Sequence, residues 1–440
     1  MAELQYQRAL KVRKDVDVLV IGGGPAGCSA AVAAARQGAR VYLAESQGCL
    51  GGLGTAGFVP AFMTFGDGEH FLAAGLGEEI LHRMWKIGRY EELGHKGSTS
   101  IKVEALKRAY DELLTEAGVE FVLGTRVIDV VREGNRIGAC ILSAKSGVYA
   151  VKAKVYVDCT GDGDICAWAG VPFDMGDDRG QCMPATLCSV WCGIDFSKRC
   201  IRDDSRVQEA YDDGVFKKLD LHLSGFWQTG EGVGGGNIGH VWGVDGTDER
   251  TLTSALVEGR KMFDEYETYY RKYIPGFENV ELVATANMMG VRESRRIRGE
   301  YTLTLDDFKV RADFPDEIGR YCYPVDIHPS DNSPEAMAEF KRMFEGLRYR
   351  KGESYGVPYR MLVPVGMDNL LMAGRCVSTD RYMMSSIRVM PGCCITGQAA
   401  GVAAAQCAVS GKAARDADVR GIQRILKQMG QYLPNYREEA

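Results

Sequence analysis

The chain has 440 residues, enough for about two or three domains of ordinary size. Hydrophobic residues make up 45% of it and charged residues 25%, a composition that excludes a disordered or fibrous protein. The formal net charge is −6 and there is no long basic run, which argues against a nucleic-acid partner.

Fourteen cysteines raise the question of a metal centre or disulfides, but the sequence contains no C-x-x-C pair. We therefore predict no metal site and expect the thiols to be reduced packing residues. Residues 1–15 lack the apolar segment of a signal peptide, and no run of about 18 apolar residues predicts a membrane span. These features predict a cytoplasmic location without a membrane partner.

The predicted elements begin with a β-α-β unit. Residues 16–21 form a β-branched run typical of a buried strand, residues 30–36 are small and helix-forming, and residues 40–44 form a second strand. A glycine-dense loop follows at residues 49–57. The hydrophobic spacing then predicts helices within residues 58–90 and 98–114, and strands at residues 119–123, 126–132, 136–142 and 148–157.

The loop between the first strand and helix carries the glycine pattern of a dinucleotide-binding site. The first glycine permits a tight turn, the second lets backbone amides approach a pyrophosphate, and the third lets helix and strand pack closely. Glu45 ends the second strand, where its carboxylate would accept hydrogen bonds from ribose hydroxyls. The residues of this loop are Gly22, Gly24, Pro25, Ala26 and Gly27.

A second glycine pattern occurs at Gly234, Gly236 and Gly239, with neither an apolar strand before it nor a helix after it. We therefore predict a flexible loop there and a single dinucleotide site in the chain. The remaining elements are predicted as a helix at residues 252–270, strands at 301–304, 321–327, 362–365 and 370–373, and helices at 397–410 and 419–429.

Six further segments carry a family resemblance, and they are residues 51–55, 157–164, 292–296, 369–375, 386–389 and 397–401. Among them are the signatures Arg-Glu-Ser-Arg-Arg at residues 292–296 and Ser-x-Arg-Val at residues 386–389. Over about residues 16–408, the chain resembles the bacterial FAD-dependent oxidoreductase family, whose FAD-binding domain is glutathione-reductase-like.

The resemblance implies an α/β fold in which a Rossmann-like, glutathione-reductase-type FAD domain carries an inserted α+β substrate domain. FAD would be bound noncovalently. We expect a discontinuous FAD-binding domain at residues 14–60, 99–170 and 356–415, a substrate or cap domain at residues 61–98 and 171–355, and a helical tail at residues 416–440.

The resemblance also implies which residues hold FAD. A helix opening near Gln398 and Ala399 would point its N-terminus at the flavin, where its partial positive charge stabilises the reduced ring. Besides this helix, the glycine loop and Glu45, the implied residues are Gly51 and Gly52 beside the phosphates, Val127 at the adenine, Thr160 and Gly161 at the adenosine half, and Gly374 and Arg375 at the ribityl or phosphate region.

Two groups of side chains in the middle of the chain are the first catalytic candidates. Arg292 and Arg295, together with Arg296, would bind a carboxylate or carbonyl substrate, or would form an internal ion-pair network. His240 and His328 are candidate general acids or bases, because a histidine side chain titrates near neutral pH, or they are structural histidines.

Further candidates lie close to these groups in sequence or in the family segments. Asp326 lies two residues before His328 and would orient or charge it. Tyr359, Arg360 and Arg388 would lie near the flavin or the substrate, or would form surface pairs.

The sequence therefore predicts an enzyme that transfers a hydride between FAD and a small organic substrate, at the interface between the FAD domain and the inserted domain. An alternative is a flavin-binding electron-transfer subunit that relays electrons to a partner protein. A flavin-dependent RNA-modifying enzyme is a third reading, which the lack of a basic stretch disfavours. The chain could also form a homo-oligomer.

Overall fold

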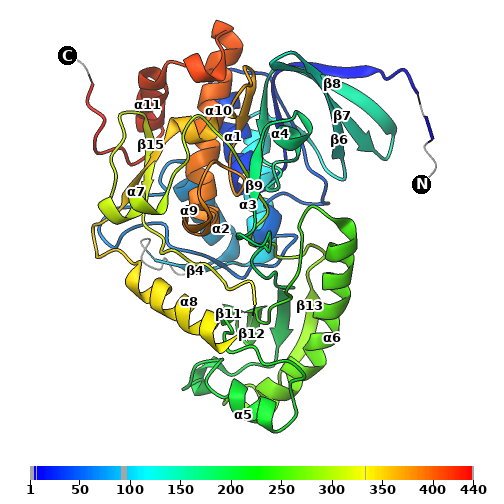
Figure 1. The fold of residues 1–440 in the computed structure, drawn as a ribbon, viewed down its shortest axis with the longest axis vertical. Helices are drawn as coiled ribbons and strands as arrows, with labels where there is room; N and C mark the ends of the chain where they lie inside the picture. The colour runs from blue at the N-terminus through cyan, green and yellow to red at the C-terminus, as the bar shows by residue number, and fades with distance from the viewer. Residues whose placement is uncertain (1–3, 6, 91–96, 332, 439–440) are drawn as a thin grey trace.

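Two sheets of different construction lie at opposite ends of an elongated molecule (Figure 1). The computed structural model describes residues 4–5, 7–90, 97–331 and 333–438. A large, mainly parallel sheet that contains the N-terminal strands occupies the broad end. A small antiparallel sheet from the middle of the chain occupies the narrow end.

The larger sheet has seven strands: β1 (Val12–Ile21), β2 (Val41–Ala44), β5 (Glu120–Val122), β6 (Arg126–Glu133), β7 (Arg136–Ala144), β8 (Gly147–Asp158) and β17 (Leu370–Met372). Its parallel part runs in the order β5-β2-β1-β8-β17, and β7 and β6 continue from β8 as an antiparallel meander. Along β1, Val18 and Val20 face one core whereas Leu19 and Ile21 face another, as strand geometry requires. The sheet confirms the predicted α/β, Rossmann-like fold.

Two helices of small residues, α1 (Pro25–Arg36) and α10 (Met390–Ser410), cross on one face of this sheet (Figure 1). A Cβ atom at Gly397 or Gly401 would overlap the backbone carbonyl of Ala26 or Ala30, so these glycines allow the helices to pack closely. The same core includes residues of three amphipathic helices, which are α2 (Leu76–Gly88), α3 (Val103–Glu116) and α11 (Val419–Gln428).

Of the helices in the described part of the chain, α10 alone is long and apolar enough to cross a membrane. In this structure 89% of its most apolar stretch is buried inside the protein. Its apolar composition is therefore explained by packing against α1 and the sheet.

The small sheet has its own core, formed with the long helix α6. Its strand order is β11-β12-β10-β13, with every neighbouring pair antiparallel. The flexible loop predicted at Gly234 is wrong, because Gly234 and Gly236 lie in β12 and pack against aromatic side chains. The elements are β10 (Ser189–Cys192), β11 (Gly225–Gly230), β12 (Val233–Asn237), β13 (Glu281–Thr285), α5 (Val207–Asp212) and α6 (Glu249–Tyr273).

Three strands predicted in the second half of the chain are wrong. Residues 301–304 and 362–365 make isolated bridges, and residues 322–327 are coil that follows the strand ending at Tyr321. Two of these segments contain a proline, which cannot donate the backbone hydrogen bond that a strand ladder needs.

Shorter elements connect the two ends of the molecule. The strands are β3 (Ala61–Phe62), β4 (Thr99–Ser100), β9 (Phe173–Met175), β14 (Arg295–Ile297), β15 (Glu317–Tyr321) and β16 (Tyr355–Pro358). The helices are α4 (Asp164–Trp168), α7 (Leu305–Val310), α8 (Pro334–Gly346) and α9 (Arg381–Ile387). Single 3-10 turns occur at Gly52–Gly54, Phe196–Lys198, Tyr359–Leu362 and Ala414–Asp416.

The packing of the cores bears on the predicted domain boundaries. Helix α2, from the segment 61–98, packs in the core of α1 and α10, as do buried side chains of residues 303–357. Residues 185–291 form the separate core around α6. Residues 91–96 and 439–440 of the predicted cap and tail lie outside the described part of the chain, and the boundaries themselves stay a prediction.

Candidate cofactor and substrate site

The glycine loop between β1 and α1 presents bare backbone at the start of the helix. A Cβ at Gly22 would overlap the carbonyl of Cys159, and one at Gly27 would overlap the carbonyl of Gly22, so both glycines are required by packing. Gly24 is different, because a Cβ there would meet nothing within 4 Å. It is the N-cap of α1, and no side chain caps that helix end. The first turn of α1 thus offers unpartnered amides to an anion.

Glu45, at the end of β2, lies beside this loop and is only 5% exposed. Its carboxylate accepts hydrogen bonds from the backbone amides of Gly23 at 2.5 Å and Gln47 at 2.6 Å. The backbone amide of Thr125 donates to the carbonyl of Glu45 at 2.9 Å, which brings the segment leading to Val127 next to this carboxylate. The Val127 side chain itself is buried in the second core of the large sheet.

Other glycines predicted to hold the cofactor meet at the same helix end. A Cβ at Gly52 would lie 3.1 Å from the Cα of Gly24, and one at Gly374 would lie 3.0 Å from the Cβ of Ala26. Gly51 is held by a hydrogen bond from its amide to the carbonyl of Gly23 at 2.7 Å. The chain segments at residues 22–27, 51–52 and 374 therefore surround the start of α1.

Arg375 joins this region to the core around α6. Its guanidinium donates to the carbonyl of Gly161 at 2.9 Å and pairs with the Asp162 carboxylate at 2.6 Å. It also donates to the backbone carbonyl of Val291. Thr160 is held by the carboxylate of Asp158, which accepts from the Thr160 hydroxyl at 2.7 Å.

These features fit an FAD molecule. The unfilled space beside Gly24 and the amides of α1 suit a pyrophosphate, and the buried Glu45 carboxylate suits a ribose hydroxyl.

The predicted helix opening near Gln398 and Ala399 is wrong, because α10 begins at Met390. Gln398 lies more than two turns into the helix, where its amide bonds to the backbone of Ala74 and Leu76 and to Gln431. Ala399 is fully buried in the core. An apolar, small-residue stretch does not show where a helix begins, since the preceding Pro391 is also compatible with a first turn.

Tyr359 and Arg360 are occupied elsewhere and are not brought to the other candidates. The Tyr359 hydroxyl donates to the carbonyl of Ala414 at 2.8 Å, and the Arg360 guanidinium pairs with Asp316 at 2.9 Å and lies over the Tyr301 ring. Both side chains thus have structural partners within the chain.

His240 and His328, by contrast, are in direct contact although they are 88 residues apart. His240 Nε2 and His328 Nδ1 are 3.0 Å apart. His240 Nδ1 lies 3.0 Å from the Asp220 carboxylate, and His328 Nε2 lies 3.5 Å from that of Asp326. We name these four residues the histidine chain. Both rings are buried, at 5% and 3% exposure.

The contacts of the histidine chain determine how many protons it holds. The Asp220 carboxylate accepts one ring N–H from His240 Nδ1, and one further ring hydrogen bridges His240 Nε2 and His328 Nδ1, so two hydrogens on the two imidazoles satisfy these hydrogen bonds. Burial, followed by the charge of Arg292, lowers the pKa of His328 well below its usual range and opposes a positive charge on this ring. Although burial acts the other way, His240 lowers the pKa of Asp220 and His328 that of Asp326. The two rings thus share the one hydrogen that bridges them.

Two arginines border the histidine chain. Arg388 Nη2 lies 3.5 Å from the Asp326 carboxylate, and Val389, the next residue, is the N-cap of α10. Arg292, adjacent to the Val291 carbonyl that Arg375 contacts, is 8% exposed. It donates to the carbonyl of Pro184 at 2.9 Å.

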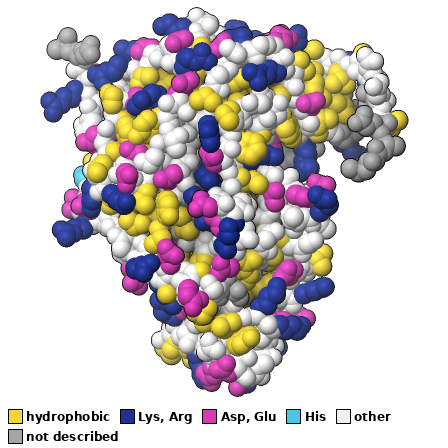
Figure 2. Space-filling view, viewed as in Figure 1, with side chains coloured by type: hydrophobic (Ala, Val, Ile, Leu, Met, Phe, Trp, Pro, Cys, Tyr) yellow, Lys and Arg dark blue, Asp and Glu magenta, His cyan; other side chains and the backbone are white. Residues whose placement is uncertain are grey.

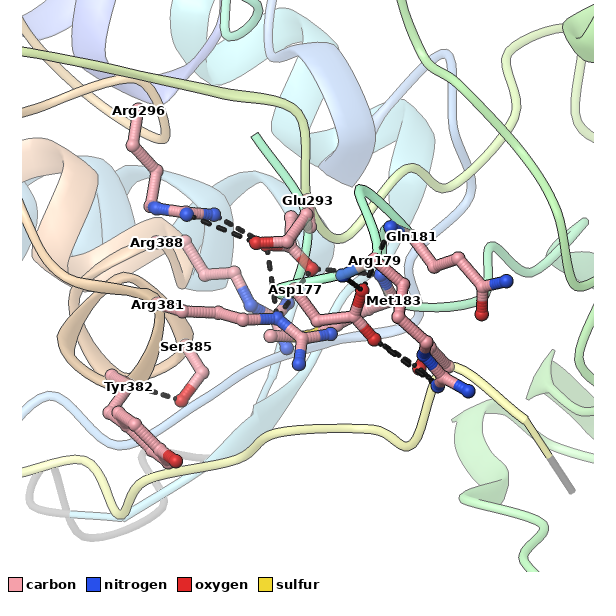
Figure 3. A network of polar contacts seen from close by, with 12 residues as sticks. Asp177, Arg179, Gln181, Met183, Glu293, Arg296, Arg381, Tyr382, Ser385 and Arg388 are labelled. Atoms are coloured by element: carbon pink, nitrogen blue, oxygen red, sulfur yellow. Dashed lines mark hydrogen bonds and ion pairs between the residues drawn. The ribbon is translucent and has the colours of Figure 1, made fainter. Parts of the chain in front are cut away.

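The other arginines of the 292–296 signature form ion pairs, and Arg296 belongs to the network shown in Figure 3. Arg296 and Arg381 converge on the fully buried Glu293 carboxylate, at 2.5 and 3.2 Å, and the backbone amide of Met183 donates to it at 2.8 Å. Arg295 pairs with Asp164 at 2.8 Å. Of the two alternatives raised by the sequence, the network describes Arg295 and Arg296, and Arg292 stands outside it.

Sequence reasoning missed Asp220 and Asn237 as neighbours of the candidate residues. Asp220 lies in a loop 20 residues before His240, and Asn237 ends β12 and approaches Arg292 Nη2 at 3.5 Å. No local pattern marks either residue, because both reach the site through the folding of the small sheet.

The sheet is Rossmann-like, a glycine loop without side chains precedes the first helix, and an acid ends the second strand. Together these features define a dinucleotide-binding oxidoreductase fold. The family model described as FAD dependent oxidoreductase matches residues 17–426. The chain belongs to this family, and its cofactor is FAD, as the sequence predicted.

The chain is also similar to two curated proteins over part of their lengths. It is 27% identical over 176 residues to digeranylgeranylglycerophospholipid reductase from Methanosphaerula palustris. This match covers 36% of this chain and 42% of that protein. It is 28% identical over 155 residues to dihydrolipoyl dehydrogenase 3 from Pseudomonas putida. This second match covers 34% of this chain and 31% of that protein. The match therefore spans less than half of either relative.

Among solved structures, the chain is similar to a geranylgeranyl bacteriochlorophyll reductase-like protein from Thermoplasma acidophilum. The TM-score is 0.48 at 13% identity, over 95% of this chain and 82% of that one. The flavin-dependent brominase Bmp2 has a TM-score of 0.48 at 12% identity, over 94% of this chain and 83% of that one.

Proposed function

We propose that this FAD-dependent oxidoreductase transfers a hydride between the flavin and a small organic substrate, with the histidine chain as its acid and base. One observation carries the proposal: the buried rings of His240 and His328 form a hydrogen bond beside residues that lead directly to the predicted FAD site. The path runs from Arg292 through the Val291 carbonyl to Arg375, which holds Gly161.

The histidine chain connects the two cores of the molecule. His240 follows β12 of the small sheet and Asp326 lies in the segment before α8, where its amide donates to Ser385 of α9 at 2.9 Å. Arg388, at the end of α9, contacts Asp326 and is followed at once by α10. Since ligand sites form preferentially at such interfaces, we place the substrate here.

When bound, FAD supplies the group that accepts or donates the hydride. The residues of the histidine chain then supply or accept the proton that accompanies the hydride. His240 and His328 share the hydrogen of the 3.0 Å contact, and both nitrogens of His240 are occupied by hydrogen bonds. His328 Nε2, whose distance to the Asp326 carboxylate is 3.5 Å, is therefore the nitrogen that would exchange a proton with a substrate hydroxyl, amine or carbonyl. Asp220 holds the outer nitrogen of His240 in place, as orienting carboxylates do for catalytic histidines.

We also propose a small-molecule partner without nucleic acid, in a reducing, cytoplasmic compartment. Figure 2 supports the first part, because Lys and Arg are interspersed with Asp and Glu over the visible face. The second part is supported by the fourteen cysteines, all of which are free thiols.

The test is a screen of the FAD-loaded protein for substrates. Pools of small alcohols, hydroxy acids, amines and enones are added without oxygen, in both redox directions, and the flavin absorbance is followed. We expect one pool to change it, and His240→Asn to slow that change by about 100- to 1,000-fold at unchanged FAD content. His82→Gln, at an exposed position of α2, is the matched control and keeps the wild-type rate.

An unchanged rate in His240→Asn would contradict the assignment of the histidine chain. A flavin that no pool oxidises or reduces, but that a protein donor reduces, would instead favour the electron-transfer alternative.

A further inference from the structure

Arg292 is a buried cation whose hydrogen-bond partners are neutral. At 8% exposure, its Nη1 donates to the Pro184 carbonyl at 2.9 Å and to the Thr186 hydroxyl at 2.8 Å, and its Nη2 reaches Asn237 Oδ1 at 3.5 Å. Within the described part of the chain, no carboxylate forms an ion pair with this guanidinium. A charge removed from water in this way is costly unless an anion compensates it.

The comparison with neighbouring arginines shows that this lack of a counter-ion is specific. Arg295 and Arg296, in the same signature, pair with Asp164 at 2.8 Å and Glu293 at 2.5 Å. Arg292 is the buried member of the signature that is left without an acid, and its side chain lies at the boundary of the small sheet rather than in the network of Glu293.

A second guanidinium increases the demand for an anion. Arg388 Nε is buried without a hydrogen-bond partner among the described residues, while its Nη2 lies 3.5 Å from Asp326. Burial, followed by the positive charge of Arg388, lowers the pKa of Arg292 to about 10, although the carboxylates of Asp326 and Asp220 act in the opposite direction. Two cations with unused N–H donors therefore lie beside the shared hydrogen of the histidine chain.

We propose that Arg292 binds a carboxylate of the substrate, so that the substrate is a small organic acid. The inference rests on the proposed function, since it names the substrate class of the same site. A guanidinium binds a carboxylate through two parallel N–H···O bonds, and such a bond would use the Nη2 and Nε donors of Arg292. The bound acid would then have its reacting carbon near His240 and His328.

The experiment compares acids with their amides on the FAD-loaded protein by titration calorimetry, which measures binding without turnover. The probes are glycolate, lactate, malonate, succinate and fumarate, each against its uncharged amide. We expect at least one acid to bind about 10- to 100-fold more tightly than its amide, because the amide cannot form the charge-assisted bidentate bonds that the carboxylate forms. If no acid is preferred, the proposal is overturned without any need of a variant.

Variants identify the residue responsible for that preference. Arg292→Met should abolish the preference for the acid, and Arg292→Lys should restore part of it. Arg298→Met is the matched control, because Arg298 lies in the same segment but is exposed and pairs with Asp174. Equal acid preference in Arg292→Met and Arg298→Met would overturn the assignment.

FAD content and the flavin midpoint potential are measured in the same variants to separate this inference from the proposed function. If Arg292→Met shifts the potential but leaves acid binding intact, the guanidinium serves the flavin and the inference is wrong, while hydride transfer stands. If acids bind through Arg292 but no acid or other pool oxidises or reduces the flavin, the anion site stands and the proposed function fails.

Discussion

The cofactor region and the proposed substrate site of this molecule are built by opposite means. Around α1 and α10, glycines and alanines let backbone approach backbone, and the carbonyls of Ala26 and Ala30 leave no room for a side chain. Between the two cores, large charged and aromatic side chains are buried, among them His240, His328 and Arg292.

The difference agrees with the two kinds of ligand that we propose for these regions. FAD has the same chemistry in every protein that uses it, and a bare helix N-terminus with a few glycines suffices to hold its phosphates. A particular substrate has to be recognised by side chains, so the second region carries desolvated charge, which reduces stability in the absence of a ligand. Four changes test whether this division holds.

The largest effect is expected at the crossing of the two helices. Alanine in place of glycine usually stabilises a helix interior by up to about 1 kcal/mol. Gly397→Ala should instead lower the free energy of unfolding by about 3 kcal/mol, because its Cβ overlaps the backbone of Ala26. Gly346→Ala, at the exposed end of α8 with nothing near its Cβ, should be neutral or stabilising in the same urea titration. Equal effects of the two changes would remove the packing argument.

The next effect concerns His222, which stacks against His240 and contacts Phe340. Burial, followed by the charge of His240, lowers its pKa from 6.5 to about 4. Between these values the unfolded chain binds more protons, so stability falls as the pH drops through this range. The part of the loss that is due to His222 should reach about 2–3 kcal/mol between about pH 7.5 and about pH 4.5, and His328, whose pKa is also lowered, adds a loss that both proteins share.

His222→Phe removes this titration and should therefore lose less stability than the wild type over the same range. Asp220 and Asp326 do not interfere, since their lowered pKa values place their loss of stability below 3.8. Parallel curves for the two proteins would show that His222 is not the group responsible.

A smaller effect is expected at Gly24, where the space beside the helix is open. Gly24→Ala should reduce FAD affinity about tenfold and change the stability of the FAD-free protein by less than about 1 kcal/mol. Equilibrium dialysis against FAD measures the first quantity and urea unfolding the second. Undiminished FAD binding would mean that the pyrophosphate lies elsewhere.

The smallest effect sharpens the contrast between buried and exposed charge. Arg298→Met breaks an ion pair with Asp174 in which both side chains are more than half exposed, at 58% and 51%. The urea midpoint should not move measurably, because exposed pairs contribute little. A clear loss of stability would indicate that β9 and β14 depend on this pair.

Much of the cofactor region could be predicted from local sequence. The glycine loop, the strand before it and Glu45 follow one another within about thirty residues, and backbone geometry alone gives those glycines their meaning. The error at Gln398 is instructive, because the same small residues suit a helix that packs on α1 as well as one that faces a flavin.

The proposed substrate site could be predicted only as a set of residue types. His240 and His328 were candidates separately, but their contact depends on how β12 and the segment before α8 are brought together. Asp220 carried no signal at all. The sequence also left open whether Arg292 binds a substrate or belongs to an ion-pair network. The burial of its guanidinium among neutral oxygens is a property of the folded chain.

The sequence by itself determined the family, the cofactor and the position of the glycine loop, because these depend on contiguous residues and on backbone conformation. The tertiary structure decided which titratable groups meet, which arginines are neutralised and where α10 begins. Those properties depend on distances between segments far apart in the chain, and on the removal of water from between them, which no local pattern encodes.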